Sequence, residues 1–248
     1  MTKTGIEWCR NPDGSHGYTL NPIRGKCPIA CPYCYARRMY DRFKWNPELR
    51  WDASVMEQLR TLKKPSGIFM CSTFEWLWNE SWAQNIISCC KAYPRHRFYL
   101  LTKLPKNLAQ FSPFPDNCWV GVTVTEPNTD DTPLAYFSKV EAKIKYISFE
   151  PLLKWTVGIS TRLVDSFYKA GIKWLIIGAC TGSKSQMKEL CKRHPDLTLM
   201  PHENRWTAQP RIEWVKEIVR AADKANIPVF LKNNLKPLIG DDLRQEMP

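Results

Sequence analysis

Short apolar runs recur along the chain, and segments with helical spacing of apolar residues lie between them. Six runs have few polar residues, which is typical of strands that are buried on both faces. They cover residues 67–71, 97–101, 118–123, 145–149, 173–177 and 227–231, and we expect a further short strand before Cys27. Asn79 is placed to cap a helix over residues 80–90, Pro210 suits the first turn of a later one, and another begins near Tyr35.

Repeated strand–helix units predict parallel strands with right-handed crossovers. We therefore expect an α/β fold, a single domain over residues 1–248 that forms a full or partial (β/α) barrel of about six parallel strands. Polar residues follow each predicted strand, at 72–75, 102–103, 123–126, 148–151, 178–182 and 232–234. In a parallel barrel these positions share the carboxyl end, where active sites lie.

Composition narrows the class of protein. With 248 residues and 44% hydrophobic content, the chain has enough apolar sequence for a folded core, which excludes a disordered protein. No run reaches the roughly 18 apolar residues of a membrane span, and the first residues lack the apolar core of a signal peptide. We expect a cytoplasmic protein with no membrane partner.

Charge points to the kind of partner. The 36 basic residues exceed the 24 acidic ones by 12. Such an excess favours anionic partners such as nucleic acid, nucleotide or phosphate. The alternative is a solvated basic surface without a specific partner.

Three of the ten cysteines lie within eight residues, in the segment Cys27-Pro-Ile-Ala-Cys31-Pro-Tyr-Cys34. Three thiolates at C-x3-C-x2-C spacing can hold three irons of a [4Fe–4S] cluster and leave the fourth iron open. The alternative is a structural zinc site, for which Cys9, His16 or Cys71 would supply a fourth ligand.

The cysteine spacing, with Tyr33 before the last cysteine, resembles the radical S-adenosylmethionine (SAM) superfamily. The resemblance implies that Cys27, Cys31 and Cys34 ligate a [4Fe–4S] cluster. It also implies that SAM binds the open iron and that an external donor such as flavodoxin or ferredoxin supplies electrons. A deoxyadenosyl radical would then abstract hydrogen from the substrate.

A closer resemblance extends over most of the chain. Leu20-Asn21-Pro22, Leu100-Leu-Thr-Lys103, Gly121-Val-Thr-Val124, Ser148-Phe-Glu-Pro-Leu152 and Phe230-Leu-Lys232 are similar to a phage and bacterial family with a three-cysteine motif. These segments also resemble radical SAM queuine lyase, a characterised relative of that family. This resemblance implies a nucleobase-type substrate and release of a 7-deazaguanine. The chain departs from the phage pattern at Phe74-Glu75-Trp76 and at Gly178-Ala-Cys-Thr-Gly-Ser.

Residues near the predicted carboxyl edge are the candidate site. Those expected to contact SAM are Tyr33, Ser72, Thr73, Lys103, Thr123 and Glu150. Those expected to contact substrate are Phe74, Glu75, Trp76, Lys232 and Asn233. A carboxylate such as Glu75 can accept two parallel hydrogen bonds from a guanine-like edge, and an aromatic ring can stack on it. The alternatives are a carboxylate paired with a nearby lysine, and tryptophans that only pack.

The sequence therefore predicts a radical SAM enzyme that acts on a nucleobase-type small molecule, with queuine lyase as the named case. Two alternatives stay open: radical SAM modification of phage or bacterial nucleic acid, and a non-catalytic zinc or iron–sulfur module that binds nucleic acid.

Overall fold

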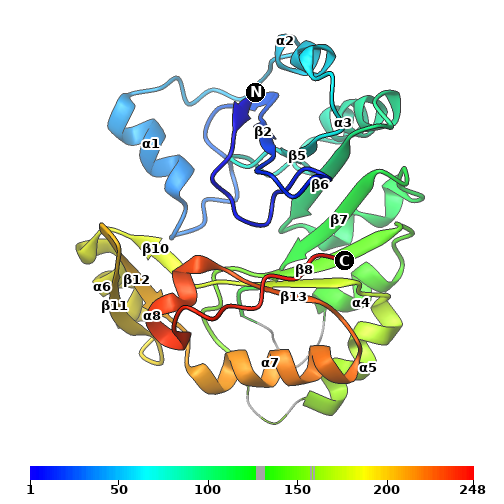
Figure 1. Ribbon diagram of the computed structural model, residues 1–248. Helices are drawn as coiled ribbons and strands as arrows, with labels where there is room; N and C mark the ends of the chain where they lie inside the picture. Colours follow the sequence, from blue (N-terminus) through cyan, green and yellow to red (C-terminus); the bar gives the residue numbers. More distant parts are fainter. Residues whose placement is uncertain (127–131, 157, 159) are drawn as a thin grey trace. The chain divides into compact units, whose positions relative to one another are not determined.

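The computed structural model describes residues 1–126, 132–156, 158 and 160–248 (Figure 1). The chain forms two compact units. Unit 1 contains Met1–Gly121 and Val140–Lys143, and unit 2 contains Val122–Lys139 and Ile144–Pro248. Strand β7, Cys118–Thr123, contributes residues to both units.

Unit 1 holds the first strands and helices of the chain. Its strands are β1 (Thr2–Lys3), β2 (Tyr18–Leu20), β3 (Ile23–Arg24), β4 (Arg50–Trp51), β5 (Gly67–Met70), β6 (Arg97–Thr102) and the first part of β7. Its helices are α1 (Tyr35–Phe43), α2 (Ser54–Glu57) and α3 (Glu80–Ala92), with 3-10 turns η1 (Gln58–Thr61), η2 (Pro105–Asn107) and η3 (Ala109–Phe111).

Parallel pairing organises the centre of unit 1. β2 pairs parallel to β5, and β5 pairs parallel to β6, whereas β1 pairs antiparallel to β2. Buried side chains of these strands, including Ile68, Met70, Phe98 and Tyr99, form the core of the unit together with Trp8. β2 is the strand that was expected before Cys27, and α3 starts as expected, because the Asn79 side chain accepts the Trp82 N–H at 3.0 Å.

Unit 2 continues the strand–helix alternation. Its strands are the end of β7, β8 (Ile144–Phe149), β9 (Trp174–Ile177), β10 (Cys180–Gly182), β11 (Thr198–His202), β12 (Arg205–Gln209) and β13 (Val229–Leu231). Its helices are α4 (Thr132–Ser138), α5 (Ser160–Ala170), α6 (Lys184–Arg193), α7 (Ile212–Lys224) and α8 (Lys236–Ile239), with the 3-10 turn η4 (Asn233–Leu235). β8, β9 and β13 pair in parallel, and their buried residues form the core with Trp214 and Ile218 of α7.

The main sheet is mostly parallel, with eight strands in the order β1-β2-β5-β6-β7-β8-β9-β13. This confirms an α/β fold and all six predicted strands. The strands at the two ends of this order, β1 and β13, each have one neighbour among the described strands. The described sheet is therefore open, and no closed barrel is seen in it.

Two features of unit 2 differ from what the sequence pattern suggests. β11 and β12 form an antiparallel hairpin that the pattern did not predict, and β12 also pairs with β10. The hairpin is partly exposed, so its strands lack the continuous apolar run that marks buried strands. Pro210 lies two residues before α7 rather than in its first turn, and Arg211 is the N-cap.

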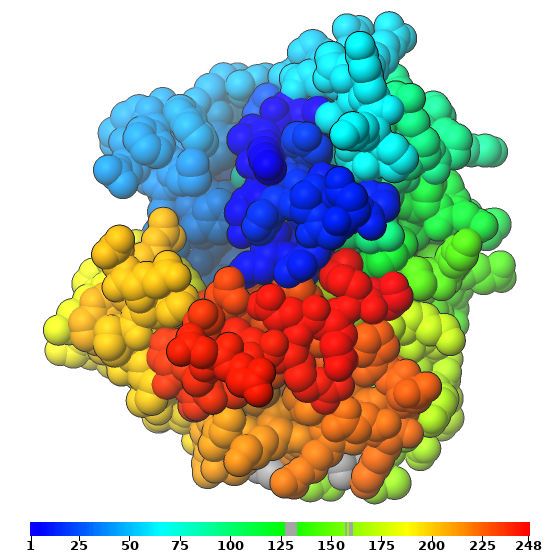
Figure 2. Space-filling model, viewed as in Figure 1, coloured from blue at the N-terminus to red at the C-terminus, as the bar shows by residue number. Residues whose placement is uncertain are grey.

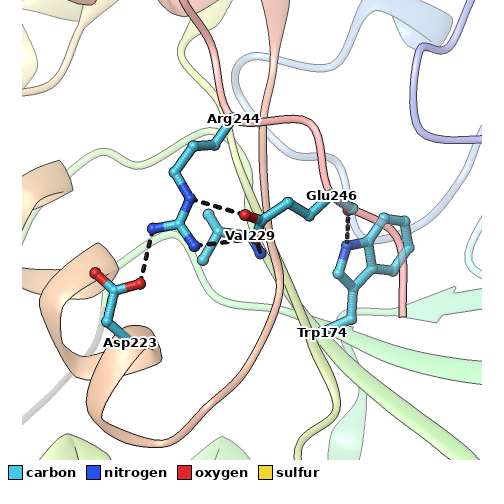
Figure 3. Close-up of polar contacts among 5 residues, drawn as sticks. All are labelled: Trp174, Asp223, Val229, Arg244 and Glu246. Atoms are coloured by element: carbon cyan, nitrogen blue, oxygen red, sulfur yellow. Dashed lines mark hydrogen bonds and ion pairs between the residues drawn. The ribbon is translucent and has the colours of Figure 1, made fainter.

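The C-terminal tail pairs with the edge of β13 (Figure 3). The Leu231 N–H donates to the Arg244 carbonyl at 2.7 Å, and the Glu246 carboxylate accepts the Val229 N–H at 2.9 Å. Arg244 bonds Asp223 of α7 at 2.8 Å, and the Trp174 indole donates to the Glu246 carbonyl at 2.9 Å. The tail thus satisfies an edge strand that would otherwise present unpaired backbone groups.

None of the helices described here is long and apolar enough to cross a membrane.

Candidate functional site

The three clustered cysteines lie on the loop between β3 and α1, and Cys34 is the N-cap residue of α1. The Ala30 N–H donates to the Cys27 carbonyl at 3.3 Å, and the Cys34 N–H donates to the Cys31 carbonyl at 3.0 Å. Ala30 has a φ of 53°, in the left-handed region, which lets the chain turn sharply between the first two cysteines. The loop therefore carries three free, half-buried thiols on two successive turns.

Cys27 lies against the segment that follows β5. Burial raises the pKa of its thiol, while hydrogen bonds from the backbone of Glu75 and Ile29 lower it in part. The Glu75 carboxylate and the Cys31 sulfur raise the same pKa further, because each is a nearby negative charge. Arg37 of α1 fixes the loop from the other side, since its guanidinium donates to the Cys27 carbonyl at 2.6 Å.

The donor chemistry of the loop suits an iron–sulfur cluster, which three thiolates at this spacing can hold. Within the part of the chain that the structure describes, no three His, Cys, Asp or Glu side chains are arranged as a metal-binding group. Binding would therefore draw the three sulfurs together and release their protons.

The structure also bears on the fourth ligand of the zinc alternative. Cys9 and Cys71 are buried, and burial raises the pKa of Cys9 to about 12 and that of Cys71 further above its ordinary value. Both side chains are packed in the core of unit 1, whereas the three cysteines of the loop are half-buried. His16 is exposed, in an isolated β-bridge with Arg10.

Asn21 orders the end of β5, where two predicted SAM contacts lie. Its side-chain oxygen accepts the Ser72 hydroxyl at 3.1 Å and the Thr73 N–H at 3.3 Å. The preceding residue, Cys71, has a φ of 56°, and its N–H donates to the Leu20 carbonyl at 2.8 Å. The chain therefore turns sharply after β5, with half-buried hydroxyls at the turn. Asn21 is part of the Leu20-Asn21-Pro22 segment, but no role was predicted for it from the sequence.

Glu75 is a buried carboxylate, 6% exposed, that bridges the ends of β5 and β6. Its Oε1 accepts the Thr102 hydroxyl at 2.7 Å and the Leu77 N–H at 3.1 Å, and its Oε2 accepts the Lys103 N–H at 2.7 Å. Burial raises the pKa of Glu75, and these hydrogen bonds oppose the rise. A carboxylate offers about four acceptor positions, so Oε2 keeps one for a further donor.

The aromatic residues beside Glu75 have different surroundings. Phe74 and Trp76 are buried, and Trp76 lies beside Phe111 and Phe114 with ring centroids 6.3 and 6.4 Å away. The indole nitrogen of Trp76 is buried and has no hydrogen-bond acceptor among the described atoms. Trp78 is 46% exposed. Tyr33, half-buried on the cysteine loop, accepts a hydrogen bond from Arg38 at its carbonyl, at 3.2 Å.

A second polar group lies in unit 2, where β8, β9 and β13 end. Lys232 forms a largely buried ion pair with Glu150. Gly178 lies between these elements, and a Cβ there would be 2.9 Å from Lys232 Cδ and 3.4 Å from Glu150 Cγ. A larger residue there would therefore require the Lys232 side chain to shift. The structure thus joins Glu150 and Lys232, which the sequence suggested separately.

Amide side chains extend this group. Asn234 accepts the Ala179 N–H at 3.0 Å and donates to the Ala179 carbonyl at 2.7 Å. Gln209 of β12 donates to the Asn234 carbonyl at 2.6 Å, and its own buried oxygen has no donor among the described atoms. Asn233 accepts a hydrogen bond from Gln245 at 2.9 Å. Thr123 is buried at the end of β7. Asn234 belongs to the polar run 232–234 that the sequence pattern places after the last strand, whereas Gln209 was not singled out.

Residues 3–193 match the sequence model of a family described as "Protein of unknown function (DUF5131)". The chain belongs to this family. No curated protein matches the chain.

The DUF5131 match contains the cysteine loop, the Glu75 network and Glu150, and it ends with α6. Lys232, Asn233, Asn234 and Gln209 lie beyond its end. The matched residues therefore include the cysteine loop and the ends of β5 and β6 in unit 1, and the end of β8 in unit 2.

Proposed function

We propose that this protein is a radical SAM enzyme that acts on a nucleobase-type small molecule. The observation that carries the proposal is the cysteine loop, in which three free thiols at C-x3-C-x2-C spacing lie before α1 and the first of them contacts Glu75. We also propose that the open, mostly parallel sheet is the partial barrel of the radical SAM type.

Cys27, Cys31 and Cys34 would hold a [4Fe–4S] cluster, and SAM would bind beside it. When bound, the cluster and SAM together supply a strong hydrogen-atom abstractor, which no side chain of the chain provides. The half-buried thiols and the two backbone N–H groups near the Cys27 sulfur support this assignment. An external electron donor such as flavodoxin or ferredoxin completes the system.

The residues at the end of β5 are suited to hold the cofactor in place. Ser72 and Thr73 follow a sharp turn that Asn21 fixes, so the Ser72 hydroxyl and the Thr73 backbone are positioned before any ligand arrives. Tyr33 precedes the last cysteine and offers an aromatic ring for the adenine. In unit 2, Glu150 and Lys232 form an ion pair that can accept an ammonium group and donate to a carboxylate.

Substrate recognition falls to acceptors in buried surroundings. Oε2 of Glu75 accepts one hydrogen bond, from the Lys103 N–H, and a second acceptor position on this oxygen would suit the N1–H of a guanine-like base. Low exposure strengthens such a bond because water does not compete for it. Queuine, a 7-deazaguanine with an amine-linked ring, carries this edge, and queuine lyase is the named activity that we propose.

Mass spectrometry of the reaction products tests the proposal. Anaerobic protein reconstituted with iron and sulfide is mixed with SAM, dithionite and queuine. We expect 5′-deoxyadenosine and a smaller 7-deazaguanine, and neither product from Cys34→Ala protein. If the iron-loaded protein forms no 5′-deoxyadenosine with or without queuine, the proposed chemistry is wrong. Formation of 5′-deoxyadenosine without a queuine product rejects only the substrate.

A second candidate is modification of nucleic acid by the same chemistry. The net charge of +12 favours it, because a free base needs no such field. Replacing queuine with short DNA or RNA in the same assay distinguishes the two. A zinc or iron–sulfur module without catalysis would form no 5′-deoxyadenosine with either.

A further inference from the structure

Helix α1 and the segment after it form the most exposed apolar surface of unit 1. All ten residues from Asp41 to Arg50 are exposed, and Ala36 is the one buried residue of α1. The exposed side chains include large apolar ones: Tyr35 (48%), Phe43 (51%), Trp45 (47%) and Leu49 (39%). In Figure 2 this segment is the light-blue lobe at the upper left, and Figure 1 shows α1 at the rim of unit 1. Exposed aromatic residues in such numbers mark an interaction site.

The aromatic side chains on this segment are ordered by one another. The rings of Phe43 and Trp45 stack, with centroids 5.4 Å apart and an interplanar angle of 24°. Tyr40 contacts Trp45 edge-on at 5.4 Å, and the Arg42 guanidinium lies 5.3 Å from the Phe43 centroid. The rings are thus held as a stacked platform before a partner binds, which reduces the entropy cost of binding.

The backbone beneath the platform is fixed as well. The Gly25 N–H donates to the Tyr40 hydroxyl at 2.8 Å, and the Lys26 N–H donates to the Pro47 carbonyl at 2.9 Å. Gly25 has a φ of 105°, and a Cβ there would lie 2.4 Å from the Glu48 carbonyl oxygen. The close approach requires glycine, and it holds residues 46–49 against the cysteine loop.

Positive charge surrounds the platform. Between Tyr35 and Trp51 there are five basic residues and two acidic ones, a net charge of +3. One of the acidic residues, Asp41, is neutralised by an ion pair with Lys26. Arg42, Lys44 and Arg50 are exposed on the same segment as Phe43 and Trp45. We call the side chains of Arg42, Phe43, Lys44, Trp45 and Arg50 the α1 surface.

We propose that the α1 surface binds single-stranded nucleic acid. Bases stack on the Phe43–Trp45 platform, and phosphates contact Arg42, Lys44 and Arg50. Aromatic rings interleaved with basic residues are the combination that proteins use for single strands, because every base has a face to stack and every linkage carries a charge. The inference goes beyond the proposed function and does not rest on it, since no residue of the α1 surface is a cluster, SAM or substrate contact.

Charge favours a nucleic acid over an acidic protein as the partner. The excess of 12 positive charges belongs to the whole chain, so it attracts a long polyanion more than a compact partner. Protein interfaces also have an apolar centre with charge at the rim, whereas charged and aromatic residues alternate along this segment.

Fluorescence anisotropy with 20-nucleotide labelled oligomers tests the proposal. Single-stranded DNA and RNA of mixed sequence, and the DNA duplex of the same sequence, are titrated at several KCl concentrations. We expect single strands to bind more tightly than the duplex. Trp45→Ala should weaken binding by about 5- to 100-fold, as loss of one stacked base predicts. Trp45→Phe should recover most of the affinity. The DNA and RNA arms show which polymer is preferred.

A salt series separates stacking from charge. Replacing Arg42, Lys44 and Arg50 together with glutamine should reduce the slope of log K against log[KCl] by about 2, at roughly 0.7 per single-strand phosphate contact. The matched control is Tyr168→Ala with Lys169→Ala, an exposed aromatic–basic pair on α5 that should leave both affinity and slope unchanged. This control is compared with the double variant of the α1 surface that carries Lys44→Ala and Trp45→Ala.

Four results would overturn the proposal. One is absence of binding to any single strand, and another is equal loss in the Tyr168/Lys169 control and the Lys44/Trp45 variant. A third is that the protein binds an acidic flavodoxin but none of the oligonucleotides, and that Trp45→Ala abolishes the flavodoxin binding. The last is that the parent sediments as a dimer and Trp45→Ala as a monomer in analytical ultracentrifugation, while the two proteins bind the oligonucleotides equally well. Circular dichroism confirms that each variant is folded, and none of these results depends on the cluster.

Discussion

At the scale of single residues, Glu75 is the side chain that joins most parts of the unit 1 site. It accepts hydrogen bonds from Thr102, Leu77 and Lys103, and its backbone contacts the Cys27 sulfur. In Glu75→Gln, an amide nitrogen replaces one acceptor and leaves a buried N–H without a partner. We expect a loss of about 1–3 kcal/mol in the free energy of unfolding, measured by urea titration.

Glu141→Gln is the matched control for this prediction. Glu141 is an exposed glutamate of unit 1, so the same chemical change should alter stability by less than about 0.5 kcal/mol. If the urea midpoint of Glu75→Gln, like that of the control, equals the midpoint of the parent, the hydrogen bonds of Glu75 do not stabilise the fold.

The sequence singles out candidate residues more readily than their contacts. It singled out Glu75, Glu150 and Lys232 because polar residues that directly follow buried strands are easily seen in the pattern. Asn21 and Gln209 were missed, because an amide near a turn looks like an ordinary turn residue. Their roles depend on partners far away in the sequence, such as Ser72 for Asn21. No local pattern contains that information.

At the scale of elements, all six predicted strands of the main sheet were found, because strands buried on both faces are continuous apolar runs. The β11–β12 hairpin was missed because its residues are only partly buried and include Pro201 and His202. The C-terminal tail was also missed. It pairs with β13 through only a few residues, and its polar composition is typical of a disordered chain end.

The tail makes stability depend on pH. Hydrogen bonds from Arg244 and from the Val229 N–H lower the pKa of Glu246. A carboxyl with a lowered folded-state pKa stabilises the fold above its unfolded pKa, near 4.5, and loses that contribution as the pH falls through the folded value. The parent should therefore lose more stability between pH 6 and pH 3 than Glu246→Gln does.

The difference should be at most about 1 kcal/mol, because Arg244 and Glu246 are partly exposed and solvent screens the pair. Urea titrations of both proteins at the two pH values measure it, and 0.5 M KCl should reduce it. Equal losses in the parent and the variant would show that the ion pair does not hold the tail.

At the scale of the whole molecule, β7 supplies residues to both compact units. Neither unit can lose this strand and keep its sheet, so we expect both to unfold in one cooperative transition. Tryptophan fluorescence and far-UV circular dichroism should give coincident urea curves, since buried tryptophans such as Trp8 and Trp174 lie in both units. Two separate transitions would show that the units fold independently.

The metal content of the anaerobically reconstituted protein tests the central claim most directly. Iron, sulfide and zinc are measured per chain for the parent, for Cys34→Ala and for Cys191→Ala, a half-buried cysteine outside the loop. We predict about four irons per chain and a brown protein for the parent and for Cys191→Ala, and loss of the iron in Cys34→Ala. A colourless parent with about one zinc per chain, or iron that persists in Cys34→Ala, would contradict the assignment of the cysteine loop.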